Sequence, residues 1–137
     1  MTSWLLPANT KFYDVFGAFE QDETYWPMNM KAEQGDDIFI YLAAPYKQIG
    51  FFADIVAVDI NFDLIAKEVA PFIKGEMADG QNKPFMSLKP KRKFPIEAHG
   101  NLALEQLKKN GLNGMLMGAR KLDNNPALHN YIMDAIK

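Results

Sequence analysis

The stretch from Ile38 to Ile60 restricts the possible folds more than any other part of the chain. It reads IFIYLAAPYKQIGFFADIVAVDI, which is two apolar runs joined by a turn that contains Pro, Tyr, Lys, Gln and Gly. The turn is too short to contain a crossover helix, so the two runs should pair as antiparallel strands. Residues 38–44 are apolar at both alternating positions, and this pattern predicts a central strand that is covered on both faces.

The rest of the chain interleaves short strands with helices. The expected strands are Ser3–Leu6, stopped by Pro7; 85–94, where Pro90 indicates a sheet edge; and a last one within 113–122. The expected helices are one or two turns within 9–19 after an Asn or Thr cap, 61–75 after Asn61 with Pro71 ending or kinking it, 102–110, and 125–136 starting at Asn125–Pro126. Residues 21–37 and 75–84 should be loops. This order predicts an α+β fold, a curved, barrel-like, mainly antiparallel sheet with peripheral helices.

The length of 137 residues is typical of one domain, so we expect a single domain over residues 1–137. The net charge of −2 argues against a protein whose whole surface attracts nucleic acid, although it allows a local basic face. With no cysteine, the chain has neither disulfides nor thiolate metal ligands. The start MTSWLLPANTKFYD lacks the pattern of a signal peptide, and no window approaches the ~18–20 apolar residues of a membrane-spanning helix. We therefore expect a soluble, cytoplasmic protein.

Motifs of catalysis are missing from the sequence. It has no nucleophile elbow, phosphate-binding loop, zinc-protease motif or dinucleotide fingerprint. His99 and His129 are far apart without a partner motif, and Asp36–Asp37 fits a turn better than a metal site, because adjacent strand residues face opposite ways. The candidates for a catalytic acid or base are Asp14, Asp54 and His99. We expect a protein that is not an enzyme and that uses no cofactor or metal.

The densest charge run in the chain is KPKRK, from Lys89 to Lys93. Together with nearby lysines it could form a ridge that contacts phosphates, in which case the contacting residues are Lys89, Lys91, Arg92 and Lys93. The alternative is a solvated strand edge that lysines protect from pairing with another sheet. The sequence leaves both interpretations open.

Aromatic residues are concentrated in the first third of the chain. They include Trp4, Tyr13, Phe16, Tyr25, Trp26, Tyr41 and Tyr46, several of them beside Pro, Asn or Gly. Trp and Tyr suit a half-wet pocket because each has a polar group on an apolar ring, and aromatic faces stack on unpaired bases. The alternative is that these side chains are ordinary core residues.

The order of several short segments resembles the EVE-domain group of the PUA-like superfamily. The matching points are Trp4–Leu5, Trp26, Gly35–Asp36 before Ile38–Tyr41, Ile49–Gly50, and Gly111–Leu112. The resemblance spans nearly the whole chain except residues 62–100. The chain departs from the usual pattern at Leu6–Pro7–Ala8–Asn9, where members carry a Lys/Ser–Glu–Pro run. It also has no arginine before Arg92, although members have arginines in the loop that starts at Trp26.

The resemblance implies a pseudo-barrel with an aromatic pocket that receives a nucleobase. Trp4, Trp26 and Tyr41 would form the walls, and Asn9 and Asn29 would bind the base edge. Tyr13 and Tyr46 are further candidates, with Tyr46 at the rim. Related domains read modified bases in DNA or RNA, and some are fused to restriction nucleases, so the resemblance also implies DNA or RNA with a modified base, and a nuclease or other effector, as partners.

Two hypotheses of function follow. The first is a recognition domain for a modified or flipped base, in which Trp26→Ala abolishes binding and leaves the fold intact. The second is a sensor or interaction module that binds a small molecule or peptide in the same pocket. The salt dependence of binding distinguishes the two hypotheses. Binding of nucleic acid should weaken steeply as salt is added, because it depends on counterion release, whereas binding of a neutral ligand should not.

Overall fold

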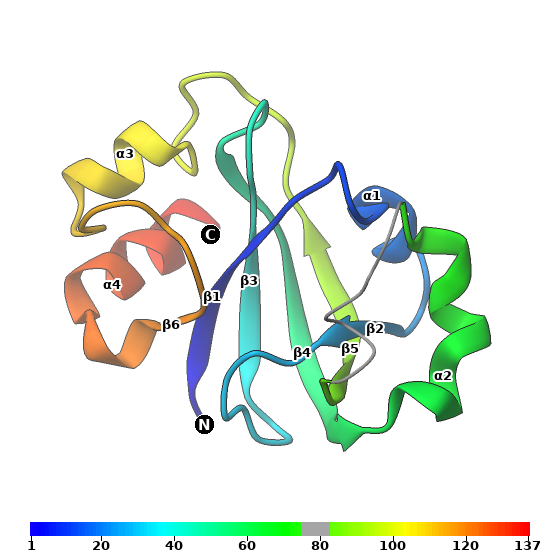
Figure 1. The fold of residues 1–137 in the computed structure, drawn as a ribbon. Helices are drawn as coiled ribbons and strands as arrows, with labels where there is room; N and C mark the ends of the chain where they lie inside the picture. The colour runs from blue at the N-terminus through cyan, green and yellow to red at the C-terminus, as the bar shows by residue number, and fades with distance from the viewer. Residues whose placement is uncertain (75–82) are drawn as a thin grey trace.

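A single curved sheet organises the chain. The computed structural model describes residues 1–74 and 83–137, and across them the sheet has six strands in the order β2-β5-β4-β3-β1-β6 (Figure 1). Their bounds are β1 Ser3–Ala8, β2 Thr24–Pro27, β3 Asp37–Leu42, β4 Gln48–Ile60, β5 Phe85–Lys93 and β6 Arg120–Lys121. The β1–β3 pair is parallel and the other four pairs are antiparallel, so the predicted α+β, mainly antiparallel architecture is confirmed.

The predicted antiparallel hairpin is the pair β3 and β4. Its register places Ile38 opposite Ala53 and Phe39 opposite Phe52, with an irregularity after Ile40. The expectation of a central strand covered on both faces is confirmed, because β3 is buried from Ile38 to Leu42 and lies between β4 and β1. Alternation along β3 then gives one large apolar cluster on each face of the sheet, and a third, small cluster of Ile65, Val69 and Phe85 lies where α2 packs against β5.

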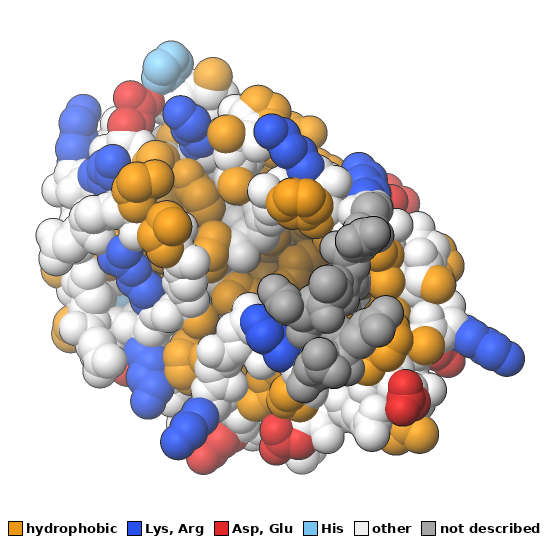
Figure 2. Space-filling view, viewed as in Figure 1, with side chains coloured by type: hydrophobic (Ala, Val, Ile, Leu, Met, Phe, Trp, Pro, Cys, Tyr) orange, Lys and Arg blue, Asp and Glu red, His pale blue; other side chains and the backbone are white. Residues whose placement is uncertain are grey.

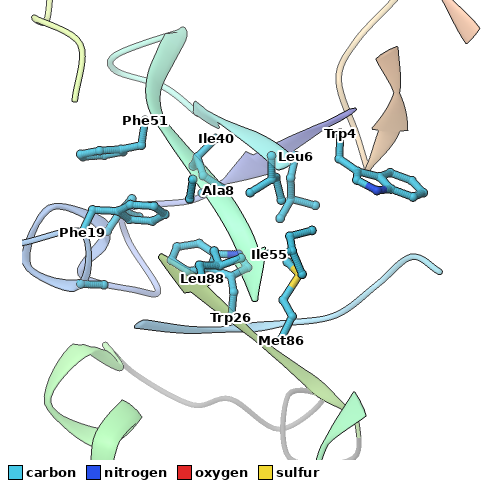
Figure 3. Close-up of a cluster of buried hydrophobic side chains, with 14 of the residues drawn as sticks. Trp4, Leu6, Ala8, Phe19, Trp26, Ile40, Phe51, Ile55, Met86 and Leu88 are labelled. Atoms are coloured by element: carbon cyan, nitrogen blue, oxygen red, sulfur yellow. The ribbon is translucent and has the colours of Figure 1, made fainter. Parts of the chain in front are cut away.

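We call the two large clusters the inner and the outer cluster. The inner cluster fills the concave side between the two halves of the sheet (Figure 3) and includes Trp4, Leu6, Ala8, Phe19, Trp26, Ile38, Ile40, Phe51, Ile55, Met86 and Leu88. The outer cluster lies beneath the two C-terminal helices and includes Leu5, Phe39, Tyr41, Ile49, Leu107, Leu112, Leu122, Leu128, Ile132 and Ile136. The neighbouring strand residues Leu5 and Leu6 thus belong to different clusters, as a period of two requires.

Four α-helices cover the sheet across the described residues. They are α1 Val15–Ala18, α2 Phe62–Val69, α3 Leu104–Lys109 and α4 Pro126–Ala135. The 3-10 turn η1 Ala70–Phe72 follows α2, and η3 Leu122–Asn124 precedes α4. The side chains of Asn61 and Asn125 cap α2 and α4, and Pro126 is the first residue of α4, as predicted. Gly111 follows α3 with φ +121, the left-handed conformation expected of a glycine C-cap. Figure 1 shows α3 and α4 at one side of the sheet and α1 and α2 at the other.

Three expectations of secondary structure are wrong. Strand β1 does not stop at Pro7 but continues to Ala8. Proline is tolerated there because β6 pairs only with Trp4 and Leu5, which leaves β1 with a single strand neighbour at Pro7. The segment predicted to be a loop contains β2, which pairs with the far-off β5. Helix α1 starts after Asp14, whose carboxylate accepts from the Gly17 amide at 3.1 Å, and not after Asn9 or Thr10.

The loop predicted for 75–84 lies mostly outside the described residues. The strand expected within 113–122 is limited to Arg120–Lys121. In the part of the chain that the structure describes, no helix is both long and apolar enough to cross a lipid bilayer.

Candidate functional site

The second half of β5 is an open edge of the sheet. Strand β2 pairs with β5 only from Phe85 to Leu88, whereas β4 accompanies β5 as far as Lys93. Within the described ranges, residues 89–93 therefore have a strand neighbour on one side only. Pro90 falls in this half, which confirms the prediction that it indicates a sheet edge.

A groove of about 600 Å³ runs beside this open edge. One wall is the basic half of β5, and the other is the segment between α1 and β2. The lining residues are Phe19, Gln21, Asp22, Phe51, Lys89, Pro90, Lys91, Arg92 and Lys93. We call this feature the edge groove. It brings the basic run, predicted from sequence, against residues about seventy positions earlier in the chain.

The floor of the edge groove is a stacked pair of phenylalanines. The ring centroids of Phe19 and Phe51 are 4.6 Å apart and the ring planes differ by 18° (Figure 3). Phe16 packs edge-on against Phe51 at 5.7 Å, and Trp26 packs against Phe19 at the same centroid distance. Because Phe19 is 8% and Phe51 2% exposed, the pair offers edges to a ligand and does not open to admit one.

The four basic residues of the groove differ in whether other groups of the protein already engage their charged ends. The Lys91 ammonium pairs with Asp54 at 3.4 Å, and the Arg92 guanidinium donates to the Ile136 carbonyl and lies 5.0 Å from the centre of the Phe94 ring. Arg92 therefore points to the outer face, where it holds the end of α4. No carboxylate in residues 1–74 and 83–137 lies within 4.0 Å of the Lys89 or Lys93 ammonium.

Of the four basic residues of the groove, Lys89 and Lys93 are thus the ones most available to an anionic ligand. On the face of the molecule in Figure 2, Lys and Arg side chains are spread among apolar and neutral ones and do not merge into one basic patch. Separated charges of this kind do not favour general attraction to polyanions.

The predicted aromatic cage is wrong in its geometry. Trp4 and Trp26 are 4% and 6% exposed in the inner cluster, whereas Tyr41 is 6% exposed in the outer cluster, on the other face of the sheet. Figure 3 shows Trp4 at one end of the inner cluster and Phe19 and Phe51 at the other. The three predicted walls therefore do not line one pocket. Alternate residues of a strand point to opposite faces of the sheet, and this alternation places Trp4 and Tyr41 on different faces.

Trp4 has a structural partner instead of a ligand. Its indole Nε1 donates to Asp36 Oδ2 at 3.1 Å, and the same carboxylate accepts from the Thr2 and Glu33 amides at 2.8 and 2.9 Å. Burial alone would raise the pKa of Asp36, but these hydrogen bonds from Glu33, Thr2 and Trp4 lower it below the ordinary value. Asp36 is an anchor of the turn before β3, in agreement with the turn interpretation of Asp36–Asp37.

The other predicted pocket residues are dispersed. Tyr13 is buried, donates to the Tyr25 carbonyl at 3.2 Å, and has a pKa raised by burial to about 12. Asn9 and Asn29 are exposed, and Asn9 accepts from the Lys11 amide at 2.9 Å. Tyr46 is half-buried on the β3–β4 turn. Ligand contact by Asn9, Asn29 and Tyr46 stays a prediction.

The candidate acids and bases have structural partners. Asp14 caps α1 and Asp54 pairs with Lys91. The His99 Nδ1 lies 2.6 Å from Glu105 Oε1 at the surface, away from the edge groove. Within the described residues no group of three or more His, Asp or Glu side chains could hold a metal ion.

Sequence reasoning missed Phe19 and Phe51 as parts of the groove. Both were placed in expected elements, Phe51 at the start of a strand and Phe19 at the end of an aromatic segment. The only sequence signal was their aromatic character, since their stacking depends on the packing of α1 against β4. That contact joins segments that lie far apart in the chain.

Comparisons with known proteins identify the fold. No protein-family model and no curated protein matches the chain. Among solved structures, the ASCH protein of Zymomonas mobilis aligns over 96% of this chain and 94% of its own, at 14% identity and TM-score 0.64. Human THYN1, solved in complex with DNA containing 5-methylcytosine, aligns over 98% and 96%, at 11% identity and TM-score 0.63.

A hypothetical protein of Leishmania major has the same architecture, with 98% of this chain and 93% of its own aligned at 13% identity and TM-score 0.62. ASCH and EVE domains are both PUA-like, so the PUA-like fold predicted for this chain is confirmed. At identities this low, the likeness concerns the fold.

Proposed function

We propose that this domain binds single-stranded or locally opened nucleic acid along the edge groove. The observation that carries the proposal is the position of Lys89 and Lys93, two cations without acidic partners in the described chain, beside the stacked pair Phe19 and Phe51. Phosphate contacts supply much of the affinity of such complexes, and they fix the position of the strand without reading its sequence. Lys91 adds a third contact when a phosphate displaces Asp54.

The solved complex of human THYN1 with DNA containing 5-methylcytosine supports a nucleic-acid ligand for this fold. We extend the proposal to a modified or flipped base, read by a domain that recognises and does not catalyse. A partner nuclease or other effector would then act at the site that the domain marks. The enclosed side chains of Trp4, Trp26 and Tyr41 have no part in this contact.

Salt dependence tests the proposal. With two to three phosphates neutralised on a single strand, the slope of log K against log salt should be about −1.4 to −2. The double variant Lys89→Gln/Lys93→Gln should make the slope less steep by about 1.4, because each lysine accounts for roughly 0.7. Fluorescence anisotropy with a labelled single-stranded oligonucleotide measures both quantities.

The matched control is Lys11→Gln/Lys67→Gln, which changes the net charge equally at exposed positions outside the groove. This control should keep the wild-type slope. Equal losses in the two double variants would contradict the edge groove and indicate only general charge attraction.

The open edge of β5 also favours a second candidate function. A peptide could add a strand beside residues 89–93, since their backbone has no neighbour on that side within the described residues. Main-chain pairing of this kind depends little on salt, so a salt-insensitive peptide ligand would support this alternative over nucleic acid.

A further inference from the structure

A second hollow, of about 390 Å³, lies between the β3–β4 turn and the segment that leads into α3. We call it the turn pocket. Tyr46 lines one side of it, and Ala103 and Leu104 line the other. Its volume falls within the ~300–1,000 Å³ range of small-ligand sites, which typically combine apolar walls with a few polar groups. The turn pocket shares no lining residue with the edge groove, so it is a separate feature of the surface.

Hydrogen bonds between the two sides of the turn pocket fix its shape. The Gln48 side chain donates to the Pro95 carbonyl at 2.8 Å and accepts from the Glu97 amide at 2.9 Å. The Leu104 amide donates to the Lys47 carbonyl at 2.9 Å. Because Gln48 is 3% exposed, water competes little for its hydrogen bonds. The fold therefore forms the turn pocket before any ligand binds.

The charged residues of the turn pocket carry both signs, and three of them have no ionic partner. Lys47, Lys108 and Glu97 line it, and in the described part of the chain no oppositely charged group lies within 4.0 Å of any of them. The other two charged residues engage each other, with His99 Nδ1 at 2.6 Å from Glu105 Oε1. The two lysines and Glu97 thus line one hollow without pairing across it, and a ligand that carries both signs of charge can bridge them.

This arrangement of charges distinguishes between classes of small ligand. A bare anion such as phosphate would meet the Glu97 carboxylate as well as the lysines, and a simple amine would meet two like charges. A neutral apolar molecule would leave all three ionic groups without a partner. A zwitterion with an apolar body matches the lysines, Glu97 and the apolar walls together.

The backbone at the turn pocket has an uncommon conformation. Lys47, on the β3–β4 turn, has a φ of 53°, and His99, on the opposite side, has a φ of 65°. Non-glycine residues adopt this left-handed conformation uncommonly, and it persists only where the surrounding structure enforces it. The third such residue in the described chain is Asp59, which does not line the turn pocket. Conformations of this kind are concentrated at ligand-binding and other functional sites.

We propose that the turn pocket binds a small zwitterion with an apolar body, the chemical class of the α-amino acids. The carboxylate of the ligand contacts the Lys47 and Lys108 ammonium groups, and its own ammonium group contacts the Glu97 carboxylate. Its apolar body packs against Tyr46 and Leu104. This ligand is not nucleic acid, and its binding does not depend on the edge groove.

Four related probes test each part of the ligand. L-Leucine has all three parts, whereas isocaproate lacks the ammonium group, isoamylamine lacks the carboxylate and glycine lacks the apolar body. In titrations of the full chain followed by amide NMR, leucine should shift signals of residues 45–47 and 97–108 at a lower concentration than each of the other three probes. Equal binding of leucine and isocaproate would overturn the zwitterion. Leucine shifts that are absent or confined to other regions would overturn the site.

Variants at the turn pocket assign each charge to its part of the ligand. Lys108→Gln should weaken leucine binding about two- to fivefold, as expected for one exposed ionic contact. Its matched control is Lys109→Gln, because Lys109 is the next residue of α3, is exposed and does not line the turn pocket. The control should bind leucine as the wild type does, and equal losses in the two variants would contradict the contact of Lys108.

Glu97→Gln tests the contact with the ammonium group. It should weaken leucine binding about two- to fivefold and leave isocaproate binding no weaker than in the wild type, because isocaproate has no ammonium group. Equal weakening of both probes would contradict this role of Glu97. The control Glu68→Gln, exposed on α2, should keep the wild-type preference for leucine over isocaproate.

The apolar walls are tested by the preference for leucine over glycine. Tyr46→Ala should reduce this preference, because the ring no longer contacts the apolar body of leucine. Leu104→Ala provides the same test on the opposite wall if Tyr46→Ala does not fold. An unchanged preference in a folded variant would overturn the placement of the apolar body.

Discussion

The two halves of β5 differ in nearly every physical property. Phe85, Met86, Ser87 and Leu88 are at most 1% exposed and pair with strands on both sides, whereas the side chains of 89–93 lie at the surface beside a single strand neighbour. The first half fixes the sheet, and the second half borders the edge groove. One continuous strand thus carries both the fold and the candidate interface, and the end of β2 pairing at Leu88 separates them.

This difference means that a change in the paired half should alter stability, while a change in the open half should alter binding. The paired half is packed from both faces, so its side chains cannot be removed without leaving a cavity. The open half has few contacts to lose. The following predictions test this division, from the largest expected effect to the smallest.

Trp26, which packs beside the paired half, should be indispensable to the fold. It is 6% exposed and contacts the rings of Tyr13 and Phe19 at 4.7 and 5.7 Å. Trp26→Ala should lower the free energy of unfolding by about 3–5 kcal/mol. Urea denaturation followed by circular dichroism measures this loss. A stable variant that no longer binds nucleic acid would instead restore the aromatic cage predicted from the sequence.

Neighbouring residues on either side of the boundary offer a matched pair. Leu88→Ala removes a fully buried side chain and should cost about 2–5 kcal/mol of unfolding free energy. Lys89→Ala, one residue further, should change it by less than about 0.5 kcal/mol. The same denaturation experiment compares them, and similar values for the two variants would mean that the boundary at Leu88 is misplaced.

Asp36 ties the turn before β3 to Trp4, and its removal should cost an intermediate amount. Asp36→Asn replaces an acceptor of three hydrogen bonds with a group that also donates, so about 1–3 kcal/mol of unfolding free energy should be lost. Because the folded pKa of Asp36 is lowered, this stabilisation is present above the ordinary value of 3.8 and disappears as pH falls through the folded pKa.

The pH dependence provides the check on Asp36. Denaturation of wild type and Asp36→Asn at several pH values should give a difference that is constant at neutral pH and shrinks below 3.8. A difference that grew as the solution became more acidic would contradict the stated role of the carboxylate.

Substitution of Asp54 should have the smallest effect, and it should alter binding and not stability. It pairs with Lys91 at 3.4 Å, and both side chains are well exposed. Asp54→Asn frees the lysine for a phosphate and should tighten oligonucleotide binding by up to about fivefold at low salt, in line with the ~0–1 kcal/mol of surface ion pairs. Anisotropy measures the change; weaker binding would mean that Asp54 itself contacts the ligand.

The sequence predicted the elements that depend on local pattern. The 38–60 hairpin, the Asn61 and Asn125 caps and the Gly111 C-cap were all readable, because turn length, side-chain capping and glycine conformation act over a few residues. Strand β2 could not be predicted in this way, because a strand of four residues is stabilised by its pairing with β5, some sixty residues later in the chain.

The candidate site was predicted only in part. The basic run 89–93 was correctly located at the surface, since charged side chains favour exposure. The burial of Trp4 could not be predicted, because it depends on the parallel pairing of β1 with β3 and on a hydrogen bond to Asp36, 32 residues away. An excess of aromatic residues alone does not separate a core from a pocket.

Mapping the contact of a single-stranded oligonucleotide along β5 tests the central claim most directly. Amide NMR signals of Lys89, Lys91, Arg92 and Lys93, together with Phe19–Asp22, should shift on addition of the oligonucleotide and return towards their free positions as salt is added. Signals of 85–88 should change little. Shifts centred on Arg120–Lys121 or on α2, with 89–93 unaffected, would contradict the assignment of the interface to the open half of β5.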